Sequence, residues 1–119
     1  MSVEFHELRE GRIVWAIVRD PNGFRKRRPA VILTPTLEIS RNQPLVLMAI
    51  TTSYPDPAPA HYIELPWHPN RRQTSTGLAR RSAAVLNWLD TVYPDEIDGI
   101  IGIVPGRALA EIRRRIVKN

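Results

Sequence analysis

The apolar segments of this 119-residue chain are short, and proline or another turn-forming residue closes nearly every one of them. The first segment, RIVWAIVR over 12–19, is rich in β-branched residues and is followed directly by Asp-Pro-Asn-Gly. Short runs with such boundaries predict strands, because proline and glycine interrupt regular structure and β-branched side chains fit a pleated sheet. We therefore expect a mainly β fold. A chain of this length fits one domain, spanning 1–119.

Five further segments have the same character. They cover 29–34, 45–51, 61–65, 82–92 and 100–104. The first two strands are expected to form a hairpin with a connecting loop over 22–28, while 36–42 fits either a loop or a short helical turn. Three prolines exclude regular structure over 53–60, and the polar segment 66–77 is expected to be a surface loop.

One helix is expected, and it begins at Pro105, because proline is well tolerated at the first helical position. Leu109, Ile112 and Ile116 recur at helical spacing, and Glu111 and Arg115 form an i,i+4 pair. The whole pattern predicts a small antiparallel barrel or a strongly curled sheet with a C-terminal helix, since closure protects exposed sheet edges.

The net charge of +5 comes mostly from arginine, which supplies fifteen of the seventeen basic residues. Eleven basic residues cluster in four runs, at 25–28, 71–72, 80–81 and 113–115. Guanidinium groups bind phosphate through a planar fork. The pattern therefore favours a polyanionic partner, of which nucleic acid is the commonest. A solvated, arginine-rich surface is the alternative that charge alone leaves open.

The chain has no cysteine, which excludes disulfides, thiolate metal sites and cysteine nucleophiles. The first residues, MSVEFHELREGR, are charged where a signal peptide requires an apolar run. No segment approaches the roughly 18 apolar residues of a membrane span. We therefore expect a cytoplasmic protein that does not bind a membrane.

Neither a metal site nor a cofactor motif is predicted. The three histidines lack the spacing of metal ligands, and only His61, beside the proline-rich segment, is kept as a minor catalytic candidate. The acidic residues Asp95, Glu96 and Asp98 could hold Mg²⁺, but they lack the spacing of a calcium loop. A solvated turn is the simpler interpretation of these carboxylates.

The basic hairpin loop is the most informative segment, because loops on a rigid sheet concentrate binding residues. Phe24 could stack on an unpaired base while the cations engage phosphates. Arg28 stands apart, since Pro29 fixes the backbone beside it at the start of a strand, and transition-state stabilisation needs a well-defined position. The other cations expected to bind a nucleic acid here are Arg25, Lys26 and Arg27.

A row of three hydroxyl side chains ends the apolar strand over 45–51. Thr51 is the candidate to hold a phosphate oxygen, although Thr and Ser also commonly end strands and open turns. Thr52 and Ser53 are further candidates to contact a nucleic acid, together with the basic pair Arg80 and Arg81.

These segments, in this order, resemble the MazF/PemK family of toxins from type II toxin–antitoxin systems. The similarity spans nearly the whole chain and is carried by 11–15, 28–35, 47–53, 76–78 and 101–105. Its most specific part is the Arg-Pro-Ala strand combined with the Ile-Thr-Thr-Ser end of the next strand; either motif alone would not identify the family.

The resemblance implies an SH3-like barrel that forms a homodimer and cleaves single-stranded RNA at the dimer interface, without metal or another cofactor. A cognate antitoxin would occupy the same groove, and operator DNA would be bound only through the antitoxin complex. The family's catalytic arginine corresponds to Arg28 and its catalytic threonine to Thr51. Without metal ligands or cysteine, the 2′-hydroxyl of the RNA is the expected nucleophile, in an internal transesterification.

The chain departs from many family members at two places. Its first hairpin loop is shorter and more basic, and 80–84 reads RRSAA where many members carry an Asp-Gln pair. The resemblance therefore assigns no cleavage sequence. Two other functions also fit the residues: a non-catalytic RNA- or DNA-binding barrel, and a toxin of the related CcdB type that grips a topoisomerase.

Overall fold

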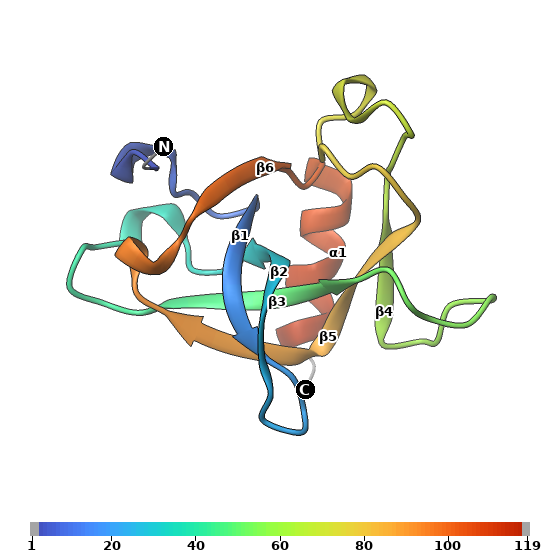
Figure 1. The fold of residues 1–119 in the computed structure, drawn as a ribbon, viewed down its shortest axis with the longest axis horizontal. Helices are drawn as coiled ribbons and strands as arrows, with labels where there is room; N and C mark the ends of the chain where they lie inside the picture. The colour runs from blue at the N-terminus through green and yellow to red at the C-terminus, as the bar shows by residue number, and fades with distance from the viewer. Residues whose placement is uncertain (1–2, 118–119) are drawn as a thin grey trace.

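One antiparallel sheet organises the described part of the chain, residues 3–117 of a computed structural model (Figure 1). The sheet has the strand order β4-β5-β3-β2-β1-β6, with β4 and β6 at its edges. The strands are β1 (Arg12–Arg19), β2 (Arg25–Ile32), β3 (Leu45–Thr51), β4 (Tyr62–Leu65), β5 (Ser82–Val92) and β6 (Gly99–Ile103). The helix α1 (Gly106–Val117) follows β6. Within residues 3–117, no helix has the length and apolar character needed to cross a membrane.

The mainly β architecture with a C-terminal helix confirms the expectation from the sequence. β1, β3 and β5 have the predicted bounds, and β4 and β6 differ from the prediction by one residue. Of the two alternatives for 36–42, the helical turn is correct, as a 3-10 turn over Thr36–Glu38. Pro105 lies just outside α1, where its carbonyl accepts a hydrogen bond from the Leu109 N–H at 2.9 Å.

The predicted hairpin loop over 22–28 is wrong, because the second strand begins inside it. Asp20 closes a much tighter turn, in which its Oδ1 accepts hydrogen bonds from the N–H groups of Asn22 and Phe24, both at 2.9 Å. Gly23 has φ +87°, a left-handed conformation that glycine adopts without steric cost. Because the Asp20 side chain closes this turn, the connection between the two strands is shorter than the sequence suggested.

With this turn closed, the first two strands pair along their whole length, from Arg19 opposite Arg25 to Ile13 opposite Val31. All four basic residues of 25–28 therefore lie in β2 and not in a mobile loop. Because side chains alternate along a strand, the basic run is divided between the two faces of the sheet.

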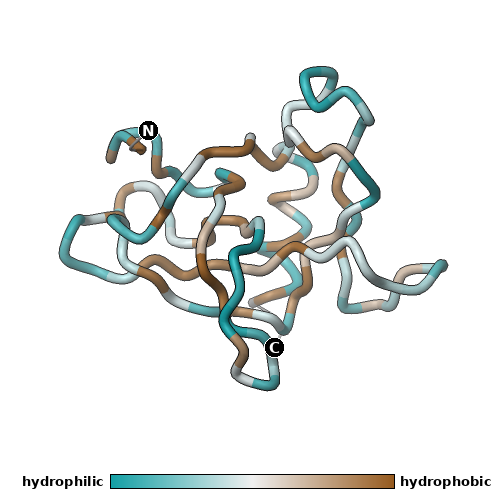
Figure 2. Tube along the Cα trace, viewed as in Figure 1, coloured by the Kyte–Doolittle hydropathy of each residue, from teal (hydrophilic) through white to brown (hydrophobic). Residues whose placement is uncertain are grey.

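The sheet buries an apolar cluster on each face. The first cluster includes Val14, Ala16, Val18, Ala30, Ile32, Leu45, Leu47 and Ala49. The second includes Ile13, Val31, Met48, Ile50, Ile63 and Leu86. Ile112 of α1 is fully buried in the second cluster, with Leu109 and Ile116 packed against it, so the predicted helical spacing is confirmed and α1 covers that face. Figure 2 shows hydrophobic residues along the strands and hydrophilic residues at the outer loops.

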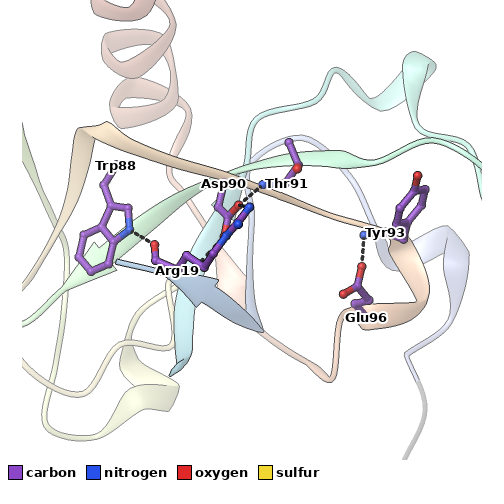
Figure 3. Close-up of polar contacts among 6 residues, drawn as sticks. All are labelled: Arg19, Trp88, Asp90, Thr91, Tyr93 and Glu96. Atoms are coloured by element: carbon purple, nitrogen blue, oxygen red, sulfur yellow. Dashed lines mark hydrogen bonds and ion pairs between the residues drawn. The ribbon is translucent and has the colours of Figure 1, made fainter. Parts of the chain in front are cut away.

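β5 meets the end of β1, although β3 and β2 lie between these two strands in the sheet. The Trp88 indole Nε1 donates to the Arg19 carbonyl at 2.6 Å, and the Asp90 carboxylate accepts from the Arg19 N–H at 2.9 Å (Figure 3). Strands that are not neighbours can meet in this way only where the sheet is strongly curled. The curled sheet is thus present, and its closure into an SH3-like barrel stays a prediction.

The long loop between β4 and β5 is fastened to β6. The Ile103 N–H donates to the Ser75 carbonyl at 2.9 Å, and the buried Thr76 hydroxyl donates to the Pro66 carbonyl at 2.7 Å. A Cβ at Gly102 would lie 2.3 Å from the Thr76 carbonyl oxygen, so this close approach requires glycine. The contact fixes one wall of the cleft described below.

Candidate functional site

Arg28 carries its guanidinium over the indole ring of Trp88, with 4.8 Å between Cζ and the ring centroid. Its Nε is buried and has no hydrogen-bond partner within residues 3–117, and none of the ion pairs there includes it. Stacking on an aromatic face holds a guanidinium through cation–π attraction and leaves its N–H groups free. Arg28 is therefore a positioned cation whose terminal N–H groups are available to an anion.

Trp88 is itself anchored by the contact between β5 and β1 (Figure 3). Its indole N–H is bonded to the Arg19 carbonyl, and two residues further along β5 the Asp90 carboxylate holds both the Arg19 N–H and, at 3.5 Å, the Arg19 guanidinium. The ring below Arg28 is thus fixed at its polar end. The sequence placed Trp88 within a strand and gave it no role. Its contacts with Arg28 and Arg19 join distant segments, and they form only because the sheet curls.

Thr51 is the last residue of β3, as predicted, and it is half-buried. Its hydroxyl oxygen accepts a hydrogen bond from the Ser53 N–H at 3.1 Å, and the same hydroxyl donates to the Ser53 carbonyl at 3.3 Å. Short side-chain-to-backbone bonds of this kind fix the direction of a hydroxyl at the start of a turn. The orientation of the Thr51 hydroxyl therefore depends on the loop that follows it.

Arg28 and Thr51 come from adjacent strands and belong to the same face of the sheet. The antiparallel pairing of β2 and β3 ends with Ala30 opposite Ala49. Arg28 lies two residues before Ala30 and Thr51 lies two residues after Ala49, so the alternation of side chains places both on the same face as these alanines. The two residues predicted to be catalytic thus lie on one face of the sheet, just beyond the end of the β2–β3 pairing.

Arg27 faces the other side of the sheet and is engaged within the chain. Its Nε and Nη2 donate to the Asp98 carboxylate at 2.9 Å and 3.1 Å, and its guanidinium lies 4.3 Å from the centroid of the Trp15 ring. The hydrogen bond to Asp98 raises the pKa of Arg27 above its ordinary value. The Arg27 side chain is partly exposed, but its charge is neutralised by the ion pair with Asp98.

The outermost candidates are all exposed. Phe24, with 71% of its surface accessible, lies in the turn between β1 and β2, and Arg25 and Lys26 begin β2 without an ion pair inside residues 3–117. His61 is also exposed, with its ring edge-on to Tyr62 at 4.6 Å. These side chains can meet a large ligand, whereas none of them is held as Arg28 is.

A cleft of about 340 Å³ lies near the site, on the Trp15 side of β2. Its lining residues are Trp15, Pro29, Thr52, Arg71, Gly77, Leu78, Ala79, Arg80, Ser82 and Ile101. The structure thus brings Thr52 and Arg80 together, as two of the predicted RNA contacts, while Ser53 and Arg81 lie outside this lining. Trp15 and Arg71 join the cleft from distant segments. Arg71 belongs to one of the basic runs and Trp15 to a segment that carries the family resemblance, but neither was named as a site residue.

The acidic turn after β5 has its own internal contacts. Asp98 is paired with Arg27, and the Glu96 carboxylate accepts a hydrogen bond from the Tyr93 N–H at 2.7 Å (Figure 3). Asp95 lies with Glu96 in a 3-10 turn. Among residues 3–117, no group of three or more His, Asp and Glu side chains is placed to hold a metal ion.

The fold and the site together define a class: a small curled β-sheet domain with an arginine that is stacked on an indole ring and has no carboxylate partner within residues 3–117. A sequence model of the PemK-like, MazF-like toxins of type II toxin–antitoxin systems matches residues 9–119. The chain belongs to this toxin family. No curated protein matches the chain significantly.

Solved structures share the fold at low sequence identity. MazF from Deinococcus radiodurans has a TM-score of 0.71 and 16% identity, over 93% of this chain and 94% of that one. A MazE–MazF structure from the same organism has a TM-score of 0.65 and 17% identity, over 93% and 92%. An endoribonuclease in complex with its cognate antitoxin, from Mycobacterial species, has a TM-score of 0.69 and 15% identity, also over 93% and 92%.

The carboxylate that anchors the arginine stack should make stability depend on pH. Burial raises the pKa of Asp90, but hydrogen bonds from the N–H groups of Arg19 and Thr91, with the Arg19 guanidinium, outweigh it and leave the pKa below its ordinary value. Such a carboxylate stabilises the fold above its unfolded-state pKa of about 3.9, and this contribution disappears as the pH falls through the lower folded value.

We predict that Asp90→Asn lowers the free energy of unfolding at about pH 7 and that the difference from the parent protein shrinks below about pH 4. Urea titrations of both proteins across this range measure the two curves. A difference that is the same at neutral and acidic pH would show that the Asp90 carboxylate does not stabilise the fold through its charge.

Proposed function

We propose that this protein is a toxin endoribonuclease that cleaves single-stranded RNA, with Arg28 and Thr51 acting on the scissile phosphate. The observation that carries the proposal is the state of Arg28, whose guanidinium is stacked on Trp88 and has no carboxylate partner within residues 3–117. A positioned guanidinium with free N–H groups suits the developing charge of a phosphoryl transition state. Membership of the MazF-like toxin family also supports this proposal.

In the proposed reaction, the 2′-hydroxyl of the RNA attacks the adjacent phosphorus and the bond to the 5′-oxygen breaks. The proton of the 2′-hydroxyl is lost and the leaving 5′-oxygen gains one, so the products are a 2′,3′-cyclic phosphate and a 5′-hydroxyl. Arg28 neutralises charge on the phosphoryl oxygens, and the Thr51 hydroxyl holds the phosphate in line for attack. The position of both residues on one face of the sheet, just beyond the end of the β2–β3 pairing, supports this division of roles.

A cognate antitoxin is the proposed protein partner, because MazF-like toxins form complexes with MazE or another cognate antitoxin in the related structures. Single-stranded RNA is the proposed substrate, with the exposed Phe24, Arg25 and Lys26 and the cleft residues Thr52 and Arg80 as contacts. Operator DNA is reached only through the antitoxin complex. These assignments follow the family and the surface charge.

The two rival functions predict a different outcome with RNA. A non-catalytic nucleic-acid-binding barrel would bind a long unstructured RNA without cutting it, and a topoisomerase-binding toxin would leave it intact. Incubation of purified protein with such an RNA therefore separates all three, because the proposed enzyme alone produces fragments.

We predict that Arg28→Ala and Thr51→Ala each reduce the cleavage rate by about 10²–10³ under saturating substrate, since each removes one preorganised donor. Arg28→Lys should also be impaired, because lysine keeps the charge but loses the planar fork. Arg25→Ala is the matched control, and it should mainly weaken binding and its salt dependence. Normally folded Arg28 and Thr51 variants that cut RNA at close to the parent rate would overturn the assignment.

We predict that cleavage persists in EDTA and that fragments end in a 2′,3′-cyclic phosphate and a 5′-hydroxyl. The reason is that neither the histidine spacing nor the acidic turn offers a ligand set for a catalytic metal. Mass spectrometry of the fragment ends tests the products. Cutting at a linkage whose 2′-hydroxyl has been replaced by hydrogen would exclude the internal nucleophile.

We also propose a homodimer, as the family resemblance implies. The apolar face of α1 does not supply the interface by itself, because Ile112 packs into the core of its own chain. Apolar surface remains beside it in a cleft of about 750 Å³, where Leu33, Val46, Leu89 and Ile116 are among the lining residues. Light scattering should give twice the 13.6 kDa chain mass at micromolar concentration. A monomer mass there would count directly against this assembly.

A further inference from the structure

Arg81, the residue before β5, directs its guanidinium into the loop that follows β3. Nη1 donates to the Tyr54 carbonyl and Nη2 to the Pro55 carbonyl, both at 3.1 Å. Nε lies 3.3 Å from the Glu64 carboxylate, and the guanidinium is stacked 3.9 Å from the centroid of the Tyr54 ring. One side chain thus joins the proline-rich loop to β4 and to the start of β5.

Tyr54 completes this cluster from the loop side. Its hydroxyl donates to the Glu64 carboxylate at 3.1 Å, and its ring lies 5.5 Å from the ring of Tyr62. Burial and the bond to Glu64 raise the pKa of Tyr54 to about 12. The phenol therefore keeps its proton, and the contact with Glu64 persists through the neutral range.

These contacts distinguish Arg81 from its neighbour Arg80. Arg80 is exposed and lines the cleft beside Trp15. Its carbonyl accepts a hydrogen bond from the Ser82 hydroxyl at 2.7 Å, but its guanidinium makes no hydrogen bond or ion pair inside residues 3–117. Arg81 is half-buried, and each of its three nitrogens already has a partner within the chain. A phosphate could bind the Arg80 guanidinium without breaking any contact within the described chain. Binding Arg81 would break its hydrogen bonds to the loop that follows β3.

The loop held by Arg81 is the one that orients Thr51. The Thr51 hydroxyl exchanges hydrogen bonds with the N–H and carbonyl of Ser53, and Ser53 is joined by one peptide bond to Tyr54, whose carbonyl Arg81 binds. If Tyr54 shifts, Ser53 shifts with it, and the hydroxyl loses its fixed direction. A displacement of about 1 Å at a reacting group can cost about 10²-fold in rate.

We propose that Arg81 is a positioning residue, which fixes the loop between β3 and β4 and so aims the Thr51 hydroxyl at the scissile phosphate, and that it does not bind RNA. The proposal replaces the sequence-based expectation that Arg81 contacts RNA. It rests on the proposed function, because it assigns Arg81 a purpose only if Thr51 acts in cleavage.

The test compares Arg81→Gln with Arg80→Gln by steady-state cleavage of a defined single-stranded RNA over a range of salt. Arg81→Gln should lower kcat by about 10–100-fold and leave KM and the salt dependence of binding unchanged. Arg80→Gln should raise KM and reduce the log–log salt slope by about 0.7, the share of one phosphate contact on a single strand, with kcat unchanged. Arg81→Lys should not restore kcat, because lysine cannot bind two carbonyls as a planar fork.

Thr51→Ala provides the second arm, as a double-mutant cycle. In that background Arg81→Gln should have little further effect on the residual rate, because the hydroxyl it positions is gone. Amide hydrogen exchange of Ser53 and Tyr54 should become faster in Arg81→Gln, whether or not RNA is present. If Arg81→Gln does not fold, Arg81→Lys is carried through the same cycle.

Three outcomes overturn the proposal. A raised KM with a reduced salt slope in Arg81→Gln would make Arg81 an RNA contact, and an equal loss of kcat with and without Thr51 would show that it acts elsewhere. Unchanged kinetics would remove any role in cleavage. Failure of the proposed function looks different, because either the parent protein would leave the RNA intact or Thr51→Ala alone would cut at the parent rate before Arg81 is changed.

Discussion

The contact between β5 and the end of β1 is the constraint on which the site depends. Trp88 and Asp90 reach Arg19 across two intervening strands, and they do so because the sheet curls. The same curl carries the Trp88 ring under Arg28, which then needs no carboxylate to hold it. A flat sheet of the same strands would leave this arginine a flexible surface cation. The fold thus holds one residue of a basic run in a fixed position, as the proposed role of Arg28 at the scissile phosphate requires.

The strands and the helix could be predicted because their signals are local. Proline, glycine and the change from polar to apolar residues mark strand ends, and Thr51 follows from the end of its own strand. The short turn between β1 and β2 could not be predicted, since a side chain, Asp20, supplies its hydrogen bonds. Trp15 and Trp88 escaped notice for another reason, because their importance arises from contacts that exist only after the chain has curled.

Clustered charge in the sequence agrees with the proposed nucleic-acid substrate, but it does not distinguish cations that are paired within the chain from cations that are not. Arg25–Arg28 read as one basic patch, yet Arg27 is paired with Asp98 while Arg28 has no such partner in the described chain. Arg80 and Arg81 form one basic pair in the sequence, yet the guanidinium of Arg81 donates hydrogen bonds to two backbone carbonyls. An ion pair lowers the net charge that a polyanion meets. The number of cations available to RNA is therefore smaller than the number in the sequence.

The alternation of side chains along β2 also separates two tasks of the proposed enzyme. Arg28 faces Trp88 on one side of the strand, while the next residue, Pro29, lines the cleft with Thr52 and Arg80 on the other. The Arg28 guanidinium is held by packing within the curled sheet, and the cleft is lined by strand residues together with Thr52 and the segment 71–80. Because loops tolerate change better than a packed face does, substitutions in the loop part of the cleft can alter which RNA is bound while the support of Arg28 stays intact. The departure of this chain from its family around Arg80 lies in that loop part, whereas the departure in the first hairpin lies in the β1–β2 turn and at the start of β2, the strand that carries Arg28.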